Sequence, residues 1–381
     1  MTEKITIHAL ALAHLPVVAE DPVWACAYTQ KIRRFVDMMR NKNYRVILYC
    51  VEGSVANADE IVTCLSEKDR DRIYGSLDNF KSQFFKHGGN DEAYTIFKKN
   101  ATREILERVG RGDILSNPLG NYYEELCKPV SEGGVEVAPG HPFLVESGIG
   151  YDGILLNTHR VFESNAWRHY VYGIYKAWTN STRFVDGDYY DDVIPNFYDP
   201  DHYEHKKSRE DYFFMNCRIA HRKGIDIAMQ TVNAIGAKLI IAGQPGEDVN
   251  MDGPNVEYIG YVTEKEKVDL LAHAKGLFST TKYIGPFEGI AVEAQLSGCP
   301  VITTDWGCYT ETVREGITGY RGMVLKDFVR GAKAIRDGKI SSKNCRNWAV
   351  SQYSTVNVAP RYDRYFRRLG DLWKSGWREI D

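Results

Sequence analysis

The chain has 381 residues, of which 43% are hydrophobic and 26% charged, a composition typical of a soluble globular protein with two domains. With 48 Lys and Arg against 51 Asp and Glu, its net charge is −3, which excludes a disordered chain and a histone-like basic protein. The eight cysteines form no C-x-x-C pair, and no apolar stretch approaches the roughly 18 residues of a transmembrane helix, so we expect a reduced, cytoplasmic protein.

The first half of the chain opens with alternating strand and helix signals. Residues 5–11 (ITIHALA) indicate a buried strand, apolar residues at helical spacing indicate a helix over 27–40, and RVILYC at 45–50 indicates a second strand. This β-α-β order is typical of a parallel sheet covered by helices. Further elements are expected in this half: a charged, mainly helical stretch at 59–100 and short strands at 113–115 and 143–145.

A turn-rich segment at 176–192 (KAWTNSTRFVDGDYYDD) divides the chain in two. Its D-x-D pair at 186–188 is a pattern that can hold a divalent cation, but similar pairs occur elsewhere in the chain and a solvated turn is the better interpretation. We expect one domain at 1–193, a second at 194–355, and a C-terminal helical segment, 356–381, that packs back on the first domain.

The second half repeats the same order of elements with clearer signals, which predicts a second doubly wound domain. Two such domains facing each other place a ligand cleft between the carboxyl ends of their strands. The expected strands lie at 212–215, 238–242, 256–259, 277–280 and 300–303, and the expected helices at 224–235, 265–272 and 291–297.

Two cations and a glycine-rich turn in this half indicate an anion site. Arg218 and Lys223 follow a strand and stand beside the start of a helix, where guanidinium, ammonium and free backbone N–H groups all oppose negative charge. The stretch 283–308 (YIGPFEGIAVEAQLSGCPVITTDWGC) then carries a turn that leads into a helix bearing Glu293. The pattern suits the binding of a diphosphate.

These motifs, taken in order, resemble a known family. They are CRI at 217–219 with KG at 223–224, AG at 242–243, the segment 258–262, PF at 286–287 with EA at 293–294, and SGCPVI at 297–302. Together they resemble the C-terminal half of family-four-type retaining glycosyltransferases (glycosyl transferases group 1). These enzymes are α/β proteins of the GT-B fold, in which two Rossmann-like, doubly wound domains face a central cleft. The resemblance is dense over 194–322 and weak over 1–190, the acceptor-binding half.

The resemblance implies a hexosyltransferase that moves a hexose from a nucleoside-diphosphate sugar, such as UDP-glucose or GDP-mannose, to a hydroxyl group. It implies a front-face reaction that retains the anomeric configuration and needs no metal and no other cofactor. A glycan, a lipid-linked sugar or a hydroxylated base of viral DNA are all candidate acceptors. A sugar-nucleotide epimerase of the same fold and an inactive sugar-nucleotide-binding protein remain alternatives.

Roles for individual residues follow from the same resemblance. The residues matching Arg218 and Lys223 hold the β-phosphate of the donor, that matching Glu293 takes the ribose hydroxyls, and those matching Tyr261 and Val262 lie against the base. Backbone N–H groups after the glycine-rich turn contact the sugar and the diphosphate. That part of the donor site is expected to comprise Pro286, Phe287, Glu288, Gly289 and Ile290.

The chain departs from the family at the turn before this helix. The family has an E-x7-E motif whose earlier Glu orients the donor sugar, but the residue eight positions before Glu293 is Gly285. Glu288 instead occupies a position where the family has Gly. We hypothesise that Glu288 takes over part of the missing contact, against the alternative that its side chain points to solvent.

A second departure concerns a histidine that many family members carry near the sugar. The matching stretch at 144–148 contains Glu146 and no histidine, while His14 lies in the loop after the first strand, where the cleft is expected. Both residues are candidates for the catalytic site, together with Arg218, Lys223 and Glu288. Because the front-face reaction needs no covalent carboxylate, no nucleophile is assigned.

Two features of the first domain bear on the acceptor. Residues 31–45 carry an excess of positive charge, which indicates either a solvated helix face or contact with an anionic surface, a membrane or nucleic acid, through Lys31, Arg33, Arg34 and Arg40. Aromatic residues make up 12% of the chain, and many lie in this half, where they suit contacts to sugar rings or bases. They include Tyr122, Tyr123, Tyr151, Trp167, Tyr170, Tyr172, Tyr175, Trp178, Tyr189 and Tyr190.

Overall fold

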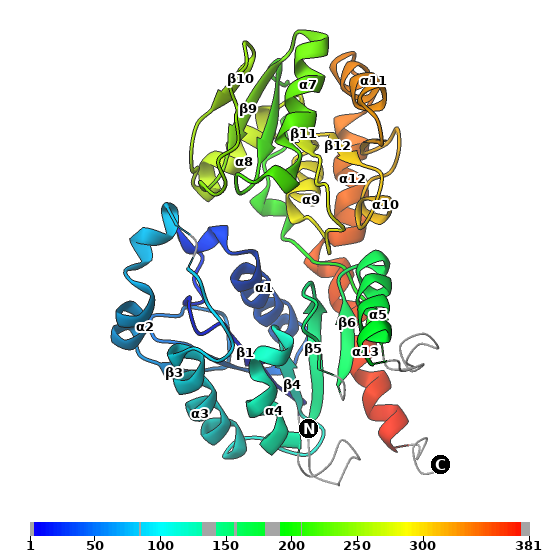
Figure 1. Ribbon diagram of the computed structural model, residues 1–381. Helices are drawn as coiled ribbons and strands as arrows, with labels where there is room; N and C mark the ends of the chain where they lie inside the picture. The colour runs from blue at the N-terminus through cyan, green and yellow to red at the C-terminus, as the bar shows by residue number, and fades with distance from the viewer. Residues whose placement is uncertain are drawn as a thin grey trace.

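The computed structural model describes residues 4–83, 85–131, 142–155, 158–179, 191–206 and 208–374. Within these residues the strands form two fully parallel sheets, one of seven and one of six strands, each covered by helices. Figure 1 shows the N-terminal domain below the C-terminal domain. The expectation of an α/β protein made of two doubly wound domains is confirmed.

The N-terminal sheet has the strand order β3-β2-β1-β4-β5-β6-β7. Because the order reverses between β1 and β4, the loops that follow these two strands diverge and open a crevice at their carboxyl ends. The strands are β1 Thr6–Leu10, β2 Arg45–Val51, β3 Glu60–Leu65, β4 Ile114–Asn117, β5 Phe143–Ile149, β6 His159–Phe162 and β7 Asp192–Val193. The helices are α1 Ala27–Asn41, α2 Glu67–Tyr74, α3 Glu92–Leu106, α4 Glu124–Ser131 and α5 Asn165–Thr179, with 3-10 turns at Val23–Ala25, Leu77–Lys81 and Gly120–Tyr123.

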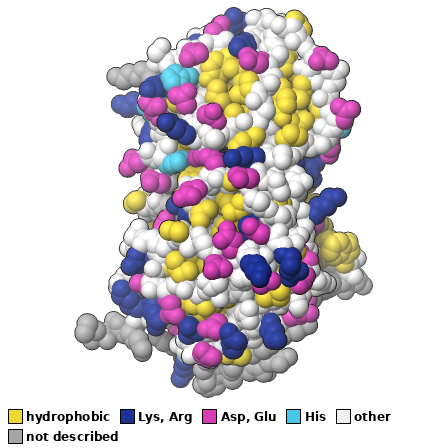
Figure 2. Space-filling view, turned by 90° about the vertical axis from the view of Figure 1, so that its left-hand side faces the viewer, with side chains coloured by type: hydrophobic (Ala, Val, Ile, Leu, Met, Phe, Trp, Pro, Cys, Tyr) yellow, Lys and Arg dark blue, Asp and Glu magenta, His cyan; other side chains and the backbone are white. Residues whose placement is uncertain are grey.

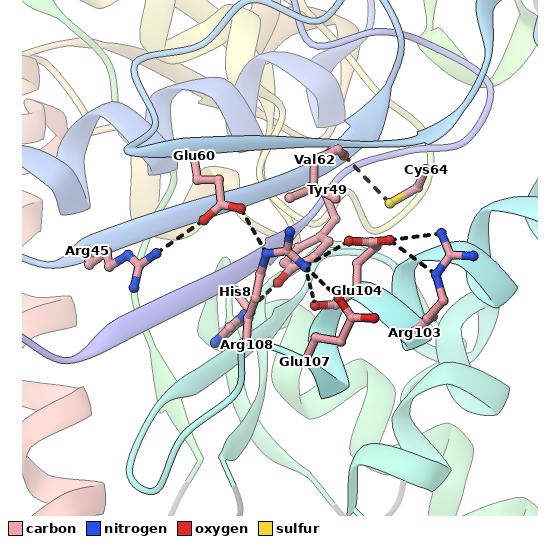
Figure 3. Close-up of polar contacts among 10 residues, drawn as sticks. All are labelled: His8, Arg45, Tyr49, Glu60, Val62, Cys64, Arg103, Glu104, Glu107 and Arg108. Atoms are coloured by element: carbon pink, nitrogen blue, oxygen red, sulfur yellow. Dashed lines mark hydrogen bonds and ion pairs between the residues drawn. The ribbon is translucent and has the colours of Figure 1, made fainter.

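Strand β3 corrects the expectation that residues 59–100 are mainly helical. It lies at the edge of the sheet, pairing only with β2 among the described strands, and exposes Ile61 to solvent. Its first residue, Glu60, belongs to an ionic network in which Arg108 Nε lies 2.8 Å from Glu60 Oε1 and Arg45 Nη2 lies 3.1 Å from Glu60 Oε2 (Figure 3). Arg108 also contacts Glu104 at 2.8 Å, so the network ties the edge strand to α3 at the end of the sheet away from the crevice.

The C-terminal sheet has the order β10-β9-β8-β11-β12-β13, with its reversal between β8 and β11. Its strands are β8 Tyr212–Asn216, β9 Lys238–Ala242, β10 Val256–Tyr258, β11 Gly276–Ser279, β12 Val301–Thr304 and β13 Gly319–Gly322. Its helices are α7 Ile225–Ile235, α8 Glu264–His273, α9 Gly289–Leu296, α10 Tyr309–Thr312, α11 Leu325–Arg336 and α12 Ser342–Tyr353, with 3-10 turns at Pro200–His202 and His221–Lys223.

Helix α13, Thr355–Lys374, leaves the C-terminal domain and packs against α1 of the N-terminal domain. The ring of Tyr362 meets that of Phe35 edge to face at 5.3 Å, and the hydroxyl of Tyr44 donates a 2.8 Å hydrogen bond to Asp363. A helix from the end of the chain therefore completes the core of the first domain. No helix in the described ranges is both long and apolar enough to cross a bilayer.

Candidate functional site

A cavity of about 540 Å³ is lined by residues from both domains. Its C-terminal wall is built by loops at the carboxyl ends of parallel strands, since Arg218 follows β8, Tyr261 follows β10 and Tyr283 follows β11. This is the place where open α/β sheets bind ligands, because the loops diverge at the reversal of strand order. The N-terminal wall includes His14, Trp24, Tyr28, Lys31, Arg34, His87 and Glu163.

Lys223 is the best-defined cation of the C-terminal wall. It ends the short turn that leads through Gly224 into α7, and its ammonium lies 3.0 Å from Glu288 Oε2 and donates a 2.7 Å hydrogen bond to the hydroxyl of Tyr283. Burial alone would lower the pKa of Lys223, but the carboxylate of Glu288 and the Tyr283 ring outweigh it and raise the pKa. The side chain is therefore a permanent positive charge in the cavity.

Arg218 lines the same cavity and adds a second positive charge. Burial and the neighbouring Arg222 lower its pKa from the ordinary value of 12.5, which still leaves a guanidinium charged at neutral pH. The two cations come from one β8–α7 connection, and both line the cavity.

Glu288 does not point to solvent. Its backbone is left-handed (φ 53°, ψ 67°) at the residue before α9, and its side chain is 9% exposed. Besides its contact with Lys223, its Oε1 accepts a 2.7 Å hydrogen bond from the hydroxyl of Tyr283. A side chain at positive φ is strained by about 1–2 kcal/mol, so the glycine that the resemblance implies at this position would fit the conformation with less strain.

The space beside Gly285 bears on why residue 285 is a glycine and not a glutamate. A Cβ added at Gly285 would lie 2.7 Å from both Cγ and Oε1 of Glu288. The side chain of Glu288 thus occupies the volume into which a residue at position 285 would extend. A carboxylate at 285 and one at 288 in this conformation exclude each other.

The start of α9 faces the cavity with its free backbone N–H groups. Gly289 and Ile290 line the cavity, as do Pro286 and Glu288, and no side chain in the described structure caps this helix terminus. Phe287 differs, because its ring is buried against Tyr198 in the core rather than in the cavity wall. Of the residues predicted at this turn, Phe287 therefore contributes a backbone group at most.

Glu293 lies one turn further along α9, and its carboxylate lies 2.7 Å from the ammonium of Lys267 on α8. Tyr261 and Val262 line the cavity just before α8. The hydroxyl of Tyr261 donates a 2.8 Å hydrogen bond to Asp21 of the N-terminal domain. This contact bridges the two walls of the cavity.

His14 lies in the N-terminal wall, 1% exposed, after strand β1. Its ring stacks on that of His87 with the centroids 3.8 Å apart, and its Nδ1 lies 3.0 Å from the hydroxyl oxygen of Tyr94. Burial, then the neighbouring His87 and Arg70, hold the pKa of His14 well below its usual value, so the imidazole is neutral at pH 7. The structure thus places His14 in the cleft.

Glu146, a candidate for the catalytic site, is not among the residues that line the cavity. Strand β5 continues to Ile149, so Glu146 sits inside the strand, fully buried. Its carboxylate accepts hydrogen bonds from Leu155 N–H (2.9 Å), Thr158 Oγ1 (2.7 Å) and Tyr151 Oη (3.0 Å). Burial outweighs these donors and raises the pKa of Glu146 to about 7.

The basic stretch of α1 is not one solvated or anion-binding face. Lys31 is 6% exposed, and its ammonium lies 2.7 Å from Glu163 Oε1 and donates to the carbonyl of Gly148. Arg34 lies over the ring of Tyr198 at 4.3 Å and lines the cavity. Both residues belong to the cleft wall, because α1 turns this face toward the other domain.

The two remaining cations of that stretch have acidic partners. Arg33 lies 3.5 Å from Asp37, and Arg40 lies 3.3 Å from Asp59. On the face shown in Figure 2, Lys and Arg side chains are interspersed with Asp and Glu rather than gathered together. The expected anionic-surface contact through Lys31, Arg33, Arg34 and Arg40 therefore has no common surface on which to form.

Several of the aromatic residues expected to contact an acceptor pack in the core of the first domain instead of lining the cavity. Trp167 and Tyr175 are buried in a core cluster with Tyr151 and Tyr172 against them, and Tyr123 is fully buried elsewhere. The aromatic residues that line the cavity are others, among them Trp24, Tyr28, Tyr198 and Tyr283. The D-x-D pair at 186–188 and the neighbouring Tyr189 and Tyr190 lie outside the described residues.

Sequence reasoning missed several residues of the cavity wall: Asp21, Glu163, Lys267 and Tyr283. No motif surrounds Asp21, Glu163 or Lys267, and each of these three contacts a residue distant in sequence. Tyr283 alone carried a local signal, since it stands five residues before Glu288 in the glycine-rich turn.

Comparison with known proteins agrees with this geometry. Residues 210–337, from the start of β8 to the end of α11, match the model of the family Glycosyl transferases group 1. The matched segment contains Arg218, Lys223, Glu288 and Glu293. A search of curated proteins gives no match to the sequence.

Solved structures share the fold over nearly the whole chain. AviGT4, a glycosyltransferase involved in avilamycin A biosynthesis, has a TM-score of 0.65 at 20% identity, covering 96% of this chain and 97% of its own. Sucrose-phosphate synthase from Thermosynechococcus elongatus has a TM-score of 0.69 at 13% identity, covering 97% and 100%. HepE from Anabaena, in complex with UDP and glucose, has a TM-score of 0.60 at 12% identity, covering 96% and 100%.

At these identities the solved structures establish the fold, and the family match identifies the C-terminal domain. Residues 210–337 match the glycosyl transferases group 1, and the chain as a whole has the two-domain GT-B fold of solved glycosyltransferases.

Proposed function

We propose that this protein is a retaining glycosyltransferase that moves a hexose from a nucleoside-diphosphate sugar to a hydroxyl acceptor without a metal ion. The observation that carries the proposal is the convergence of Arg218, Lys223 and the start of α9 on one cavity between the domains. As the glycosidic bond of the donor breaks, negative charge grows on the leaving diphosphate. Two fixed cations and a helix N-terminus stabilise that charge in place of a metal.

The remaining groups of the C-terminal wall fit the rest of the donor. Glu293 has a carboxylate suited to two neighbouring ribose hydroxyls, and Tyr261 and Val262 supply a half-buried surface for the base. HepE from Anabaena has been solved with UDP-glucose. A uridine donor is therefore the first candidate for this chain, and a guanosine donor such as GDP-mannose is the second.

Calorimetric titration with UDP, GDP and thymidine diphosphate tests the donor site. One of them should bind in buffer containing a metal chelator, and the matching nucleotide sugar should be slowly hydrolysed to free sugar and nucleoside diphosphate. Proton NMR of the freshly released sugar should show the anomeric configuration of the donor. Absence of binding by all three diphosphates would contradict the proposal. An epimerase would return an epimerised nucleotide sugar, and a binding protein would return the donor unchanged.

Glu288 supplies the carboxylate that orients the donor sugar, in place of the glutamate that the resemblance implies at position 285. Its side chain fills the volume beside Gly285 and reaches Lys223, so a carboxylate is present in the same region although it comes from another residue. Glu288→Gln keeps the size of the side chain and removes its charge, so we expect lower turnover and altered donor preference with little loss of nucleoside diphosphate binding.

The exchange Gly285→Glu with Glu288→Gly is the matched control for this assignment. It relieves the positive φ at residue 288, empties the volume beside residue 285 and returns a carboxylate to the earlier position. Activity should recover in the exchange variant relative to Glu288→Gly alone. Unchanged turnover and donor preference in Glu288→Gln would show that the carboxylate has no part in the reaction.

The acceptor is a hydroxyl compound that enters from the N-terminal wall, past the stacked rings of His14 and His87. Since both imidazoles have lowered pKa values through burial, they offer neutral nitrogen atoms rather than positive charge to the acceptor. A DNA acceptor has less support than a glycan or a lipid-linked sugar, because the basic face that favoured it is absent from α1.

A further inference from the structure

A row of polar contacts leads to Glu293 from the connection between the two domains. His202 Nε2 lies 2.9 Å from Glu264 Oε1, Lys267 Nζ lies 2.6 Å from Glu264 Oε2, and Lys267 Nζ lies 2.7 Å from Glu293 Oε2. The four residues come from a 3-10 turn, from α8 and from α9. Lys267 on α8 contacts Glu293 on α9, so it joins two helices of the C-terminal wall.

The row is buried at its functional end. The side chains of Lys267 and Glu293 are 12% and 15% exposed, and both line the cavity. Burial would raise the pKa of Glu293, but the Lys267 ammonium outweighs it and holds the pKa below the usual value. Burying an ion pair costs desolvation energy that its attraction barely repays, so stability alone does not explain a lysine at this position.

Two sets of hydrogen bonds hold the start of α8, and they fix the backbone position of Lys267. Thr263 and Glu266 form a capping box at the helix N-terminus, and Asp21 of the N-terminal domain accepts 3.3 Å hydrogen bonds from the backbone N–H of Glu264. Because its backbone is fixed, Lys267 can orient a neighbouring carboxylate with little movement of the helix.

The two oxygens of Glu293 are in different surroundings. Oε2 contacts Lys267, whereas Oε1 lies toward Gly289, where an added Cβ would be 3.9 Å from it. Gly289 lines the cavity at the start of α9. The same Cβ would lie 2.5 Å from the hydroxyl oxygen of Tyr198, and Glu293, Gly289 and Tyr198 all line the cavity, so Oε1 lies in the cavity wall beside the start of α9.

We propose that Lys267 is a positioning residue that orients the Glu293 carboxylate and thereby sets the selectivity of the site for a donor nucleotide with an intact ribose. This inference rests on the proposed function, in which Glu293 binds the ribose hydroxyls. It adds a residue outside the recognised motifs, reaching Glu293 from a different helix.

The test compares the affinities of ribonucleoside and 2′-deoxyribonucleoside diphosphates. Dissociation constants for UDP with 2′-deoxy-UDP, and for GDP with 2′-deoxy-GDP, are measured by calorimetry for the wild type, Lys267→Met, Lys267→Arg and Lys265→Met. The last is a matched control, since Lys265 is an exposed lysine on the same helix that does not line the cavity. A general loss of structure would weaken both members of a pair equally and leave their ratio unchanged.

For the nucleotide that binds more tightly, the wild type should prefer the ribose form by roughly tenfold or more, the scale of a hydrogen bond to a charged group. Lys267→Met should bring this ratio close to one, Lys267→Arg should keep most of it, and Lys265→Met should leave it unchanged. A wild-type ratio in Lys267→Met would overturn the inference.

A failure of the proposed function would give a different result. If the wild type and Glu293→Gln both bound the ribose and deoxyribose forms equally, Glu293 would not be the ribose ligand, and the proposed role of Lys267 would fall with it. If Lys267→Met does not fold by thermal unfolding, the double variant Lys267→Met with Glu264→Gln removes one charge of each sign. The double variant should also lose the preference for the ribose form, and a wild-type preference in it would overturn the inference.

Discussion

Glu146 is expected to make the stability of the N-terminal domain depend on pH. Its carboxyl is fully buried in β5, and burial raises its pKa from 4.5 to about 7 in spite of three hydrogen-bond donors. A pKa that is higher in the folded than in the unfolded state means that the folded state holds its proton more tightly. Folding is therefore favoured at low pH by this group and disfavoured as the carboxyl ionises.

The size and the pH range of the effect follow from the two pKa values. Below about pH 4.5 the carboxyl is protonated in both states, and its favourable contribution is complete. Between pH 4.5 and 7 the unfolded state loses the proton while the folded state keeps it, so the contribution falls by about 3 kcal/mol. Above pH 7 both states are ionised and the curve is flat.

Glu146→Gln removes this titration while keeping the shape of the side chain. The free energy of unfolding, measured by urea denaturation between pH 5 and pH 8, should rise in the variant relative to the wild type by roughly 2–3 kcal/mol as the pH increases. Glu107→Gln serves as the control, because the Glu107 side chain is 63% exposed. A wild-type-minus-variant difference that stays constant across this range would refute the argument.

Two further predictions concern the cation site and the backbone that supports it. Lys223→Met should lower kcat/KM by about 10²–10³-fold, the cost of losing one electrostatic donor to the transition state. The control Lys282→Met removes an exposed ion pair with Asp226 and should change kcat/KM little. Equal losses of kcat/KM in the two variants would contradict the role of Lys223. Gly224→Ala should destabilise the protein by several kcal/mol and displace Lys223, because φ is +72° and the new Cβ would lie 2.0 Å from the carbonyl oxygen of Thr280. Gly236→Ala, with φ +62° and open space around it, should cost only about 1 kcal/mol in thermal unfolding, and an equal cost for the two variants would count against the clash.

The fold and the C-terminal wall of the cavity were largely predictable because the sequence patterns that indicate them are local. Buried strands such as β1 and β2 are short apolar runs, and α1 has apolar residues at helical spacing. Arg218 and Lys223 stand within one connection after β8, so their common direction follows from the turn itself. Edge strand β3 was missed because it exposes residues and begins with an acidic side chain, as a helix surface would.

The N-terminal wall could not be predicted in the same way. Whether Glu146 reaches the cleft depends on where β5 ends, and the strand continues three residues beyond it. Whether the cations of α1 face solvent depends on which side of the helix meets the other domain, and this placed Lys31 against Glu163, 132 positions away in sequence. Hydrophobic patterning does not distinguish a solvated helix face from one that lines a polar cleft.

The sequence by itself thus determined the class of the fold, the family match of the second domain and the pair of cations that line the cavity, since each depends on residues close together in the chain. The tertiary structure decided which carboxylates enter the site. Glu288 enters because a left-handed residue turns its side chain into the volume beside Gly285, and Glu293 is oriented by a lysine on another helix. Such contacts are set by the packing of distant segments, and that packing has no signature in the local sequence.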